Sequence, residues 1–357
     1  MNDISATLNK IFVRNLDGSD LMEIFFVTAV ASILAIRGFL HLTGYPQFSP
    51  GNLHIAHVLV GGIFMLLAMI LFQAFTGRAA RSLAALLGGF GFGAFIDEVG
   101  KFVTANNDYF FKPSVAIIYI IFIIIYFLME RINRSPWLSD KERLVNVLEL
   151  TKEAVTQDLR SEDQQRALSL LNEADPNNPV TIALSELMKN IESIPTQGPD
   201  AWTRIKRRAS NAYARIVRKP WFTRAVMALF ITISLFSLLT NSLEIIIQFI
   251  PELQPAPLTL SDLGGAVSAL LASAYVAAGV LRMRRDRLRA YRLFKTSILI
   301  QIFLVDIFIF LDMEFAGLIK LAIDIAVLLT LRYMIDQETM VIDSASIQPA
   351  VQQGSPP

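Results

Sequence analysis

Uninterrupted apolar runs are the feature that most constrains this chain. Residues 114–129 read SVAIIYIIFIIIYFLM and residues 225–239 read AVMALFITISLFSLL, without a single Asp, Glu, Lys or Arg. A helix needs about 20 mostly apolar residues to cross a bilayer, where every backbone N–H and C=O group must be bonded internally. The chain is 54% hydrophobic and only 18% charged, whereas a soluble domain carries about 25% charged residues. We therefore predict an all-α, polytopic membrane protein.

Eight segments fit transmembrane helices in length and composition. They are residues 21–43, 53–75, 83–103, 114–131, 225–250, 261–281, 296–312 and 315–335. The pattern predicts two four-helix membrane regions, at 1–135 and 225–336, separated by about ninety residues of different character. Because the first twenty residues are polar, we expect no cleavable signal peptide.

The positions of Lys and Arg predict the orientation of the spans. The loop after the second span holds Arg78 and Arg81, and residues 282–295 hold seven basic residues against the single Asp286. The alternate loops, at 44–52, 251–260 and 312–315, contain no Lys or Arg. Basic loops stay in the cytoplasm, so we expect a plasma (inner) membrane protein with both termini cytoplasmic. Residues 337–357 are expected to form a disordered cytoplasmic tail.

The segment between the two groups, residues 136–203, predicts a cytoplasmic insert of three short helices. Ser139 with Glu142, and Ser161 with Gln164, have capping-box spacing, in which the hydroxyl and the later side chain satisfy unpaired helix donors. Asn178 followed by a proline fits a helix N-cap and first turn.

The insert has two interpretations that the sequence leaves open. It carries twelve acidic and six basic residues, so it could present a docking surface for a cytoplasmic protein partner. The simpler interpretation is a helical linker that packs against the spans.

Residues 204–224 carry eight basic residues and no acidic one, interleaved with Tyr213, Trp221 and Phe222. Such a segment is typical of a helix that lies on an anionic inner leaflet, where each basic group contributes about 1 kcal/mol. We expect membrane lipids as partners and no nucleic acid, because the net charge is only +1 and the basic residues flank spans.

Ionisable residues inside the first four spans gather toward one depth, at the outer face. Arg37 lies near the outer end of the first span, the chain's three histidines (His41, His54 and His57) surround the first outer loop, and the third span ends with Asp97, Glu98 and Lys101. A charged group in the bilayer costs about 2.5–3.5 kcal/mol and usually faces the bundle interior. This clustering predicts a polar site.

Two chemistries fit these residue types. In the first, His54, His57 and Asp97 or Glu98 bind a divalent metal with an open position for water. In the second, no metal is present. His57 or Glu98 then serves as a general base, while Arg37 and Lys101 hold an anionic group such as a lipid phosphate.

The catalytic candidates are accordingly His57, Asp97, Glu98 and Lys101, and the ligand-binding candidates are Arg37, Asn107, Asp108 and Lys112. A purely structural alternative also exists, because residues four apart share a helix face. Asp97 and Lys101 would then pair with each other and neutralise the span.

Residues 50–130 resemble the VanZ-like family of small bacterial membrane proteins. The shared pattern is a span that begins H-x-x-H, a glycine-rich span that ends D-E-x-x-K-F, and a following N-D; here these are His54, His57, Asp97, Glu98, Lys101, Phe102, Asn107 and Asp108. Lys101 stands where the family usually has Gln. The resemblance implies a bacterial cell-envelope setting. The whole chain also resembles polytopic bacterial membrane proteins.

The second group of spans contains further ionisable residues, among them Asp306, Lys320 and Asp324. Lys320 and Asp324 are four apart and can pair within one helix. We expect Asp306 to meet Lys320 across the hairpin at 312–315.

Three function classes follow from these patterns. The first is a site on the outer face that binds or acts on an envelope lipid or its headgroup. The second is a proton- or ion-coupled transporter that uses Asp306, Lys320 and Asp324. The third is a membrane scaffold or sensor whose cytoplasmic insert docks a partner.

Overall fold

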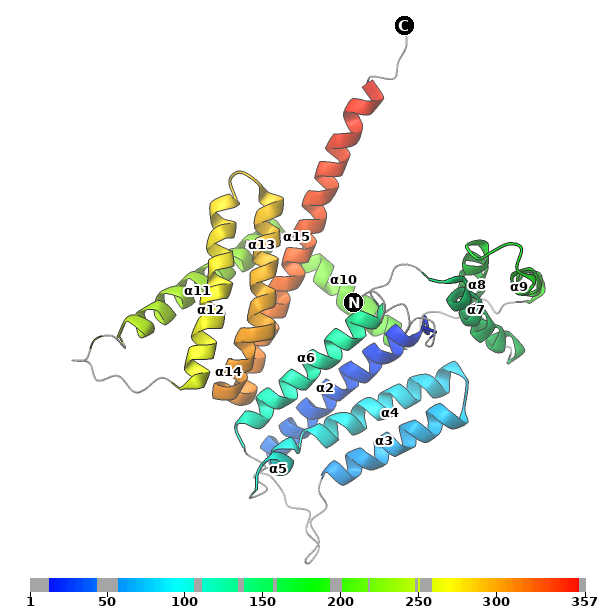
Figure 1. The fold of residues 1–357 in the computed structure, drawn as a ribbon, viewed down its shortest axis with the longest axis horizontal. Helices are drawn as coiled ribbons and strands as arrows, with labels where there is room; N and C mark the ends of the chain where they lie inside the picture. The colour runs from blue at the N-terminus through cyan, green and yellow to red at the C-terminus, as the bar shows by residue number, and fades with distance from the viewer. Residues whose placement is uncertain are drawn as a thin grey trace, which may run out of the picture. The chain divides into compact units, whose positions relative to one another are not determined.

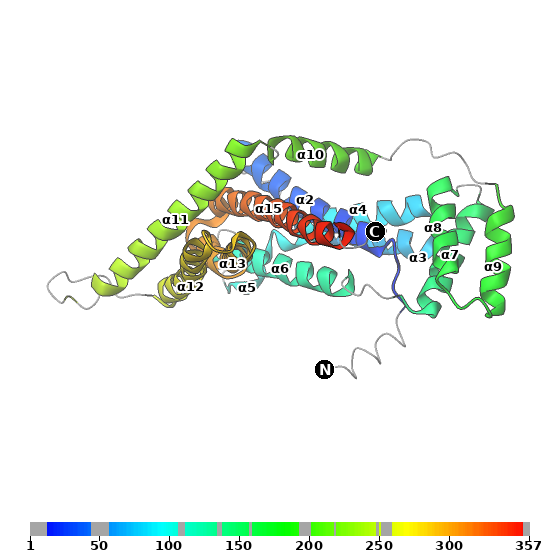
Figure 2. The same cartoon turned by 90° about the horizontal axis from the view of Figure 1, so that it is seen from above.

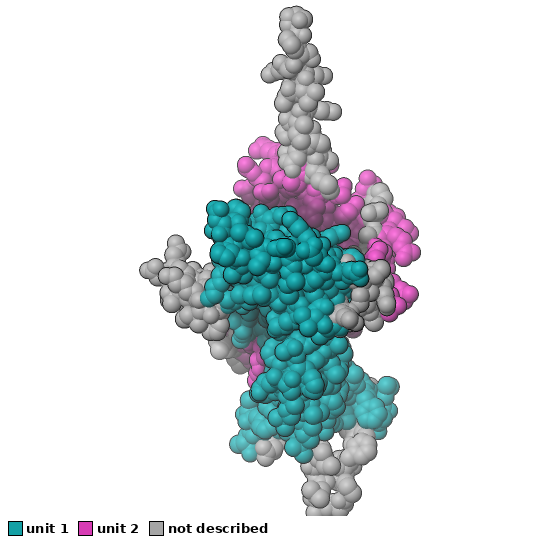
Figure 3. Space-filling model, turned by 90° about the vertical axis from the view of Figure 1, so that its right-hand side faces the viewer, with its two compact units in different colours: residues 1–109, 124–200 teal, residues 110–123, 201–357 magenta. Residues whose placement is uncertain are grey.

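The computed structural model describes residues 13–43, 57–105, 111–133, 138–156, 159–192, 201–217, 219–247, 250 and 259–352. All its elements are helices (Figure 1). The chain divides into two compact units, residues 1–109 with 124–200 and residues 110–123 with 201–357 (Figure 3). The predicted all-α class is confirmed.

Five helical segments are long and apolar enough to cross a membrane: Gly18–Leu40, His57–Ala74, Arg78–Ile96, Pro113–Ile132 and Ser261–Arg282. A shorter apolar stretch, Arg224–Ser237, lies in α11 (Pro220–Ile247). These segments match the predicted spans one to four and six. The predicted total of eight spans is not confirmed by the described residues.

The membrane part of the first unit is built around α4 (Arg78–Ile96), which packs against α2 (Gly18–Thr43) and α3 (His57–Ala74). The contact between α3 and α4 lacks side chains at its closest point. A Cβ atom added to Gly61 would lie 2.6 Å from the carbonyl oxygen of Gly91, and one added to Gly91 would lie 2.6 Å from that of Gly61. Small residues allow such close approach of membrane helices, so the glycine-rich sequence of α4 positions its C-terminal end against both neighbours.

The insert forms α7 (Asp140–Val155), α8 (Ser161–Asn172) and α9 (Pro179–Asn190), which lie together in Figures 1 and 2. The prediction of three short helices in the insert is confirmed. Its own hydrophobic core includes Val147, Leu159, Ala167 and Met188, which are almost fully buried.

Two of the three predicted helix starts in the insert are confirmed. Ser139 and Glu142 form a capping box, and the Asn178 side chain accepts from the backbone N–H of Val180, with proline in the first turn. The capping box predicted at Ser161 is wrong. Arg160 is the N-cap residue, and the Gln164 amide instead donates to the carbonyl oxygens of Met188 and Ile191 at the end of α9.

The second unit contains α10 (Ala201–Val217), α11, α12 (Leu260–Arg282), α13 (Arg287–Ile300), α14 (Asp306–Met313) and α15 (Gly317–Gln352), together with the first half of α6 (Pro113–Asn133). Its core joins Phe230 of α11, Val276 of α12, Phe294 and Ile298 of α13, and Leu331 of α15. Side chains from four helices therefore hold α12, α13 and α15 side by side (Figure 1).

The region predicted as the seventh span is a composite helix. A π-helical segment, η2 (Gln301–Val305), joins α13 to α14. At the turn that follows, Glu314 has a φ of 50°, in the left-handed region. The last helix then extends through Gln352. The predicted tail at 337–357 begins within this helix, and its disorder stays a prediction.

Candidate functional site

The polar residues predicted at the end of the first bundle do meet in the structure. Arg37 of α2 donates through Nε to Oδ1 of Asp97 at 2.6 Å and through Nη2 to the Asp97 backbone carbonyl at 3.0 Å. Asp97 is fully buried and Arg37 is mostly buried. These two hydrogen bonds connect the C-terminal part of α2 to the end of α4, which is a structural role for a charge-assisted contact.

Glu98, the next residue, faces a different neighbour. Its Oε1 accepts a hydrogen bond from the His57 backbone N–H at 2.8 Å and lies 3.2 Å from Nδ1 of the His57 ring. Its Oε2 lies 3.4 Å from Nζ of Lys101. Glu98 therefore connects the start of α3 to the segment after α4, and its carboxylate also favours the positive end of the α3 dipole.

A break between α4 and α5 (Val99–Val103) explains why adjacent acids point to different partners. Glu98 is the N-cap residue of α5 with φ −91° and ψ 14°, in the sparsely populated bridge region where many active-site residues sit. Phe95 and Phe102 stack across the break with ring centroids 6.2 Å apart. The local turn therefore sends Asp97 to α2 and Glu98 to α3.

The side chains of Glu98, His57 and Lys101 differ in their exposure to solvent, which indicates different roles for them. Glu98 is only 1% exposed, whereas the His57 side chain is 40% exposed and that of Lys101 is 24% exposed. Oε2 of Glu98 is buried and accepts no hydrogen bond within the described part of the chain. The arrangement is a buried carboxylate that orients a half-exposed imidazole beside an ammonium group.

Several predicted site residues cannot be placed with this group. His54, Asn107 and Asp108 lie outside the described residues, as does the side chain of His41. Lys112 is exposed and belongs to the second unit. Asp97 contacts Arg37, and Glu98 contacts His57 and Lys101. The structural alternative of a pair between Asp97 and Lys101 stays a prediction.

The metal hypothesis concerned His54, His57 and Asp97. Among the residues that the structure describes, no group of three His, Asp or Glu side chains could hold a metal ion. His57 contacts Glu98, and Asp97 contacts Arg37. Since His54 lies outside the described ranges, a divalent metal at these three residues stays a prediction.

A second buried cluster lies in the other unit. Nζ of Lys320 is 2.6 Å from Oδ1 of Asp306 and 2.5 Å from Oδ2 of Asp324. The predicted contact across the hairpin and the pair within α15 are both confirmed. The two carboxylates are nearly fully buried, at 1% and 4% exposure, so two acids share one base.

Sequence reasoning missed the polar contacts that surround this cluster. The Tyr119 hydroxyl of α6 donates to the carbonyl oxygen of Ile302 at 2.5 Å, inside the π-helical segment. The Gln301 amide donates to the Ser234 hydroxyl of α11 at 3.2 Å. The available signals were Tyr119 and Ser234, polar residues within apolar runs, but partners from distant helices cannot be read from local patterns.

The insert is held to the membrane part of its own unit by ion pairs. Arg78, at the start of α4, lies 3.1 Å from Glu153 and 3.0 Å from Asp163. Arg81 pairs with Glu149. Arg78 and Arg81, whose positions were used to predict the orientation of the spans, thus also bind acidic residues of α7 and α8. The contacts favour the linker interpretation of the insert, and a protein partner there stays a prediction.

The segment before α2 completes this attachment. Arg14 donates to Glu142 at 2.7 Å, and Asn146 donates to the Arg14 carbonyl oxygen at 2.8 Å. The hydrogen bond from Arg14, assisted by the backbone N–H and hydroxyl of Ser139, lowers the pKa of Glu142 to about 2. Burial raises the pKa of Glu153 above its ordinary value.

Comparison with protein-family models, with curated proteins and with solved structures returns no match for this chain. The resemblance to the VanZ-like family therefore rests on the motif residues alone. In the part of the chain that the structure describes, the fold is all-α, with five helices long and apolar enough to span a membrane and two buried clusters of ionisable residues.

Proposed function

We propose that this protein is an integral membrane protein of the bacterial cell envelope that binds, and acts on, the polar headgroup of a membrane lipid. The group that carries the proposal is His57, Glu98 and Lys101. Its main support is the contact of the half-exposed His57 ring with a carboxylate that is itself buried.

Such a contact has a chemical use. A buried carboxylate fixes the orientation and tautomer of an imidazole, as in many catalytic and metal-binding histidines. Lys101 adds a partly exposed ammonium group next to it, which attracts a phosphate. His57 would then transfer a proton to or from the headgroup as a general acid or base.

Arg37 and Asp97 have a supporting role in this proposal. Their ion pair is buried and connects two helices, so it holds the end of α4 in the position from which Glu98 reaches His57. With both termini in the cytoplasm, as predicted, His57, Glu98 and Lys101 would lie at the outer face of the plasma membrane.

The test uses the full chain in vesicles of phosphatidylethanolamine and phosphatidylglycerol. Mass spectrometry counts the lipids that co-purify, and a headgroup assay measures their release into solution. We expect His57→Gln and Glu98→Gln to lower lipid retention or headgroup release by at least about tenfold, since each removes one hydrogen-bonding group of the site.

The matched control is His41→Gln, which removes another of the chain's three histidines. It should behave like the parent protein. Equal behaviour of the parent, His57→Gln and Glu98→Gln would refute the proposal, provided that their thermal unfolding is similar.

A second function, proton- or ion-coupled transport, is supported by the other cluster. Asp306 and Asp324 together carry one negative charge more than Lys320 can neutralise. Since a buried unpaired charge is costly, this site favours binding of one proton or one monovalent cation. Tyr119 of α6 is the further titratable side chain near both acids.

The π-helical segment strengthens this second candidate. It ends at Val305, directly before Asp306, and π-helical turns within α-helices are rare and occur frequently at functional sites. The segment also frees backbone carbonyl groups, one of which Tyr119 bonds.

Proton flux into vesicles that contain the purified protein tests this candidate. We expect Asp306→Asn to abolish flux, because the site then loses its excess charge. The control is Asp312→Asn, which removes an exposed acid from the same helix. Absence of flux in the parent protein, or unchanged flux in Asp306→Asn, would exclude the second function.

A further inference from the structure

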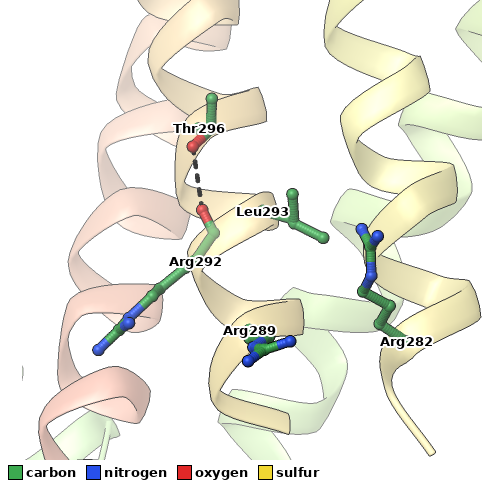
Figure 4. A pocket seen from close by; sticks show the side chains of 5 residues that line it. All are labelled: Arg282, Arg289, Arg292, Leu293 and Thr296. Atoms are coloured by element: carbon green, nitrogen blue, oxygen red, sulfur yellow. Dashed lines mark hydrogen bonds between the residues drawn. The ribbon is translucent and has the colours of Figure 1, made fainter. Parts of the chain in front are cut away.

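A basic hollow lies between the end of α12 and the first turns of α13. Its volume is about 300 Å³, and it is lined by Arg282, Arg289, Arg292, Leu293 and Thr296. In Figure 4, Arg282 extends from α12 toward α13, Leu293 points back toward it, and Arg289 lies one turn below Leu293; the guanidinium group of Arg292 turns to the other side of α13.

The charge of this hollow is only partly neutralised. Asp286 caps α13 by accepting from the Arg289 backbone N–H at 2.9 Å, and it pairs with Nε of Arg289 at 3.0 Å. Arg282 forms no ion pair with any residue that the structure describes. The guanidinium groups of Arg282 and Arg289 therefore have one carboxylate between them, and the hollow favours an anion.

The position of the hollow, at the end of a helix long enough to span a membrane, indicates which kind of anion it binds. Arg282 is the last residue of the segment Ser261–Arg282, one of the five helices that are apolar and long enough to span a membrane. The two residues before it, Val280 and Leu281, are 39% and 81% exposed. An apolar helix surface thus leads directly to a cationic hollow, as a lipid with acyl chains and a charged headgroup would require.

Thr296 adds a directional contact. Its hydroxyl donates to the Arg292 carbonyl oxygen at 3.1 Å, the bond that is dashed in Figure 4. The hydrogen is used in that bond, so the oxygen can accept a hydrogen bond from a headgroup hydroxyl. Guanidinium groups, in turn, bind phosphate oxygens with two parallel hydrogen bonds.

We propose that the hollow between α12 and α13 binds the phosphate of an anionic phospholipid headgroup, with Arg282 and Arg289 as its main contacts, Thr296 as acceptor for a headgroup hydroxyl, and the acyl chains along α12. Basic pockets between membrane helices are a known way to hold such headgroups. This site lies in the second unit and does not depend on the function proposed for His57, Glu98 and Lys101.

The test is a titration of the full chain in neutral detergent with short-chain phosphatidylglycerol, followed by native mass spectrometry. The pocket variant is Arg282→Gln with Arg289→Gln. The control variant is Arg284→Gln with Arg285→Gln, which removes the same charge from exposed residues of the same turn that do not line the hollow. A parallel titration uses glycerol phosphate, which has the phosphate and hydroxyl groups but no acyl chain.

We expect the pocket variant to bind phosphatidylglycerol at least about tenfold more weakly than the parent protein, and the control variant to stay within about twofold. Glycerol phosphate should bind far more weakly than the lipid. Equal losses in the two variants would show diffuse surface charge and overturn the site. Equally tight binding of glycerol phosphate would overturn the lipid assignment, and an unaffected pocket variant would overturn both.

Discussion

Nζ of Lys320 lies 2.6 Å from Oδ1 of Asp306, across the turn between α14 and α15. Asp324, one helical turn after Lys320, contacts the same ammonium group. The single base therefore holds two buried acids together.

Replacing the base should be costly for this reason. In Lys320→Met, two carboxylates stay buried without a counter-charge, so we expect a loss of about 3–5 kcal/mol in the free energy of unfolding. Thermal unfolding in detergent measures it. Adding Asp306→Asn should recover part of the loss, whereas Lys295→Met, at an exposed lysine of α13, should change little. A single mutant as stable as the parent would contradict the close pairing.

The glycine contact between α3 and α4 predicts that alanine substitutions at Gly61 and Gly62 change the stability by different amounts. Gly61→Ala places a methyl group 2.6 Å from the backbone of α4, so the helices must separate, at a cost of about 1–3 kcal/mol. At Gly62 nothing lies within 4 Å of an added Cβ, so Gly62→Ala should stay within about 1 kcal/mol of the parent. Circular dichroism melting curves compare the two, and equal stabilities would contradict the packing.

The low pKa of Glu142 predicts that attachment of α7 weakens in acid. Its pKa is about 2 in the folded protein against an ordinary value of 4.5, so the folded state favours the charged form. The resulting stability, about 1 kcal/mol after solvent screening is allowed for, is fully present above pH 4.5 and is lost as the pH falls toward 2. Hydrogen exchange of α7, corrected for the intrinsic effect of pH, measures this loss.

Glu142→Gln should remove that pH dependence and lower protection of α7 at neutral pH. Glu173→Gln is the control, because the Glu173 side chain is 65% exposed and its pair with Arg143 spans 3.3 Å. If both variants lose protection with the same pH profile as the parent, Arg14 does not set the charge of Glu142.

Arg78 links α4 to two acids of the insert. Arg78→Gln should therefore loosen α7 and α8 by about 1 kcal/mol, the scale of partly exposed ion pairs, and high salt should reduce the difference from the parent. Limited proteolysis of the insert at low and high salt measures this. Lys189→Gln, at an exposed residue of α9, should leave the cleavage rate unchanged. An unaffected cleavage rate in Arg78→Gln would show that hydrophobic contacts alone hold the insert.

The helical class and the insert could be predicted because their signals are local. An apolar run of spanning length is visible in the sequence of the helix itself. The caps at Ser139 and Asn178 involve residues only two or three positions apart. The cap at Ser161 failed because Gln164 finds stronger partners at the end of α9. Predicted spans five, seven and eight are not confirmed among the described residues. In the seventh, a π-helical segment interrupts the helix, and in the fifth only the shorter stretch Arg224–Ser237 is apolar enough.

The sequence predicted which residues form the candidate site better than it predicted which of them contact each other. The sequence placed four of these residues near the same end of the predicted spans, namely Arg37, His57, Asp97 and Glu98, and therefore predicted that they lie close together. Which acid meets which base depends on the break between α4 and α5, whose angles no residue pattern specifies. Tyr119 was missed for a related reason, because its acceptor is a backbone carbonyl of a helix more than 180 residues away in the chain.

The π-helical segment Gln301–Val305 has a consequence for how this sequence can change. A regular α-helix turns by about 100° per residue, and the π-helical turn holds one residue more than a regular turn. The residues before and after it are thus in two different registers of one helix. If residues 301–305 wound as regular α-helix, Asp306 would turn by about 100° away from Lys320, although every charged group would still be present. Deleting a single residue between 301 and 305 would instead restore regular winding and leave Asp306 facing Lys320.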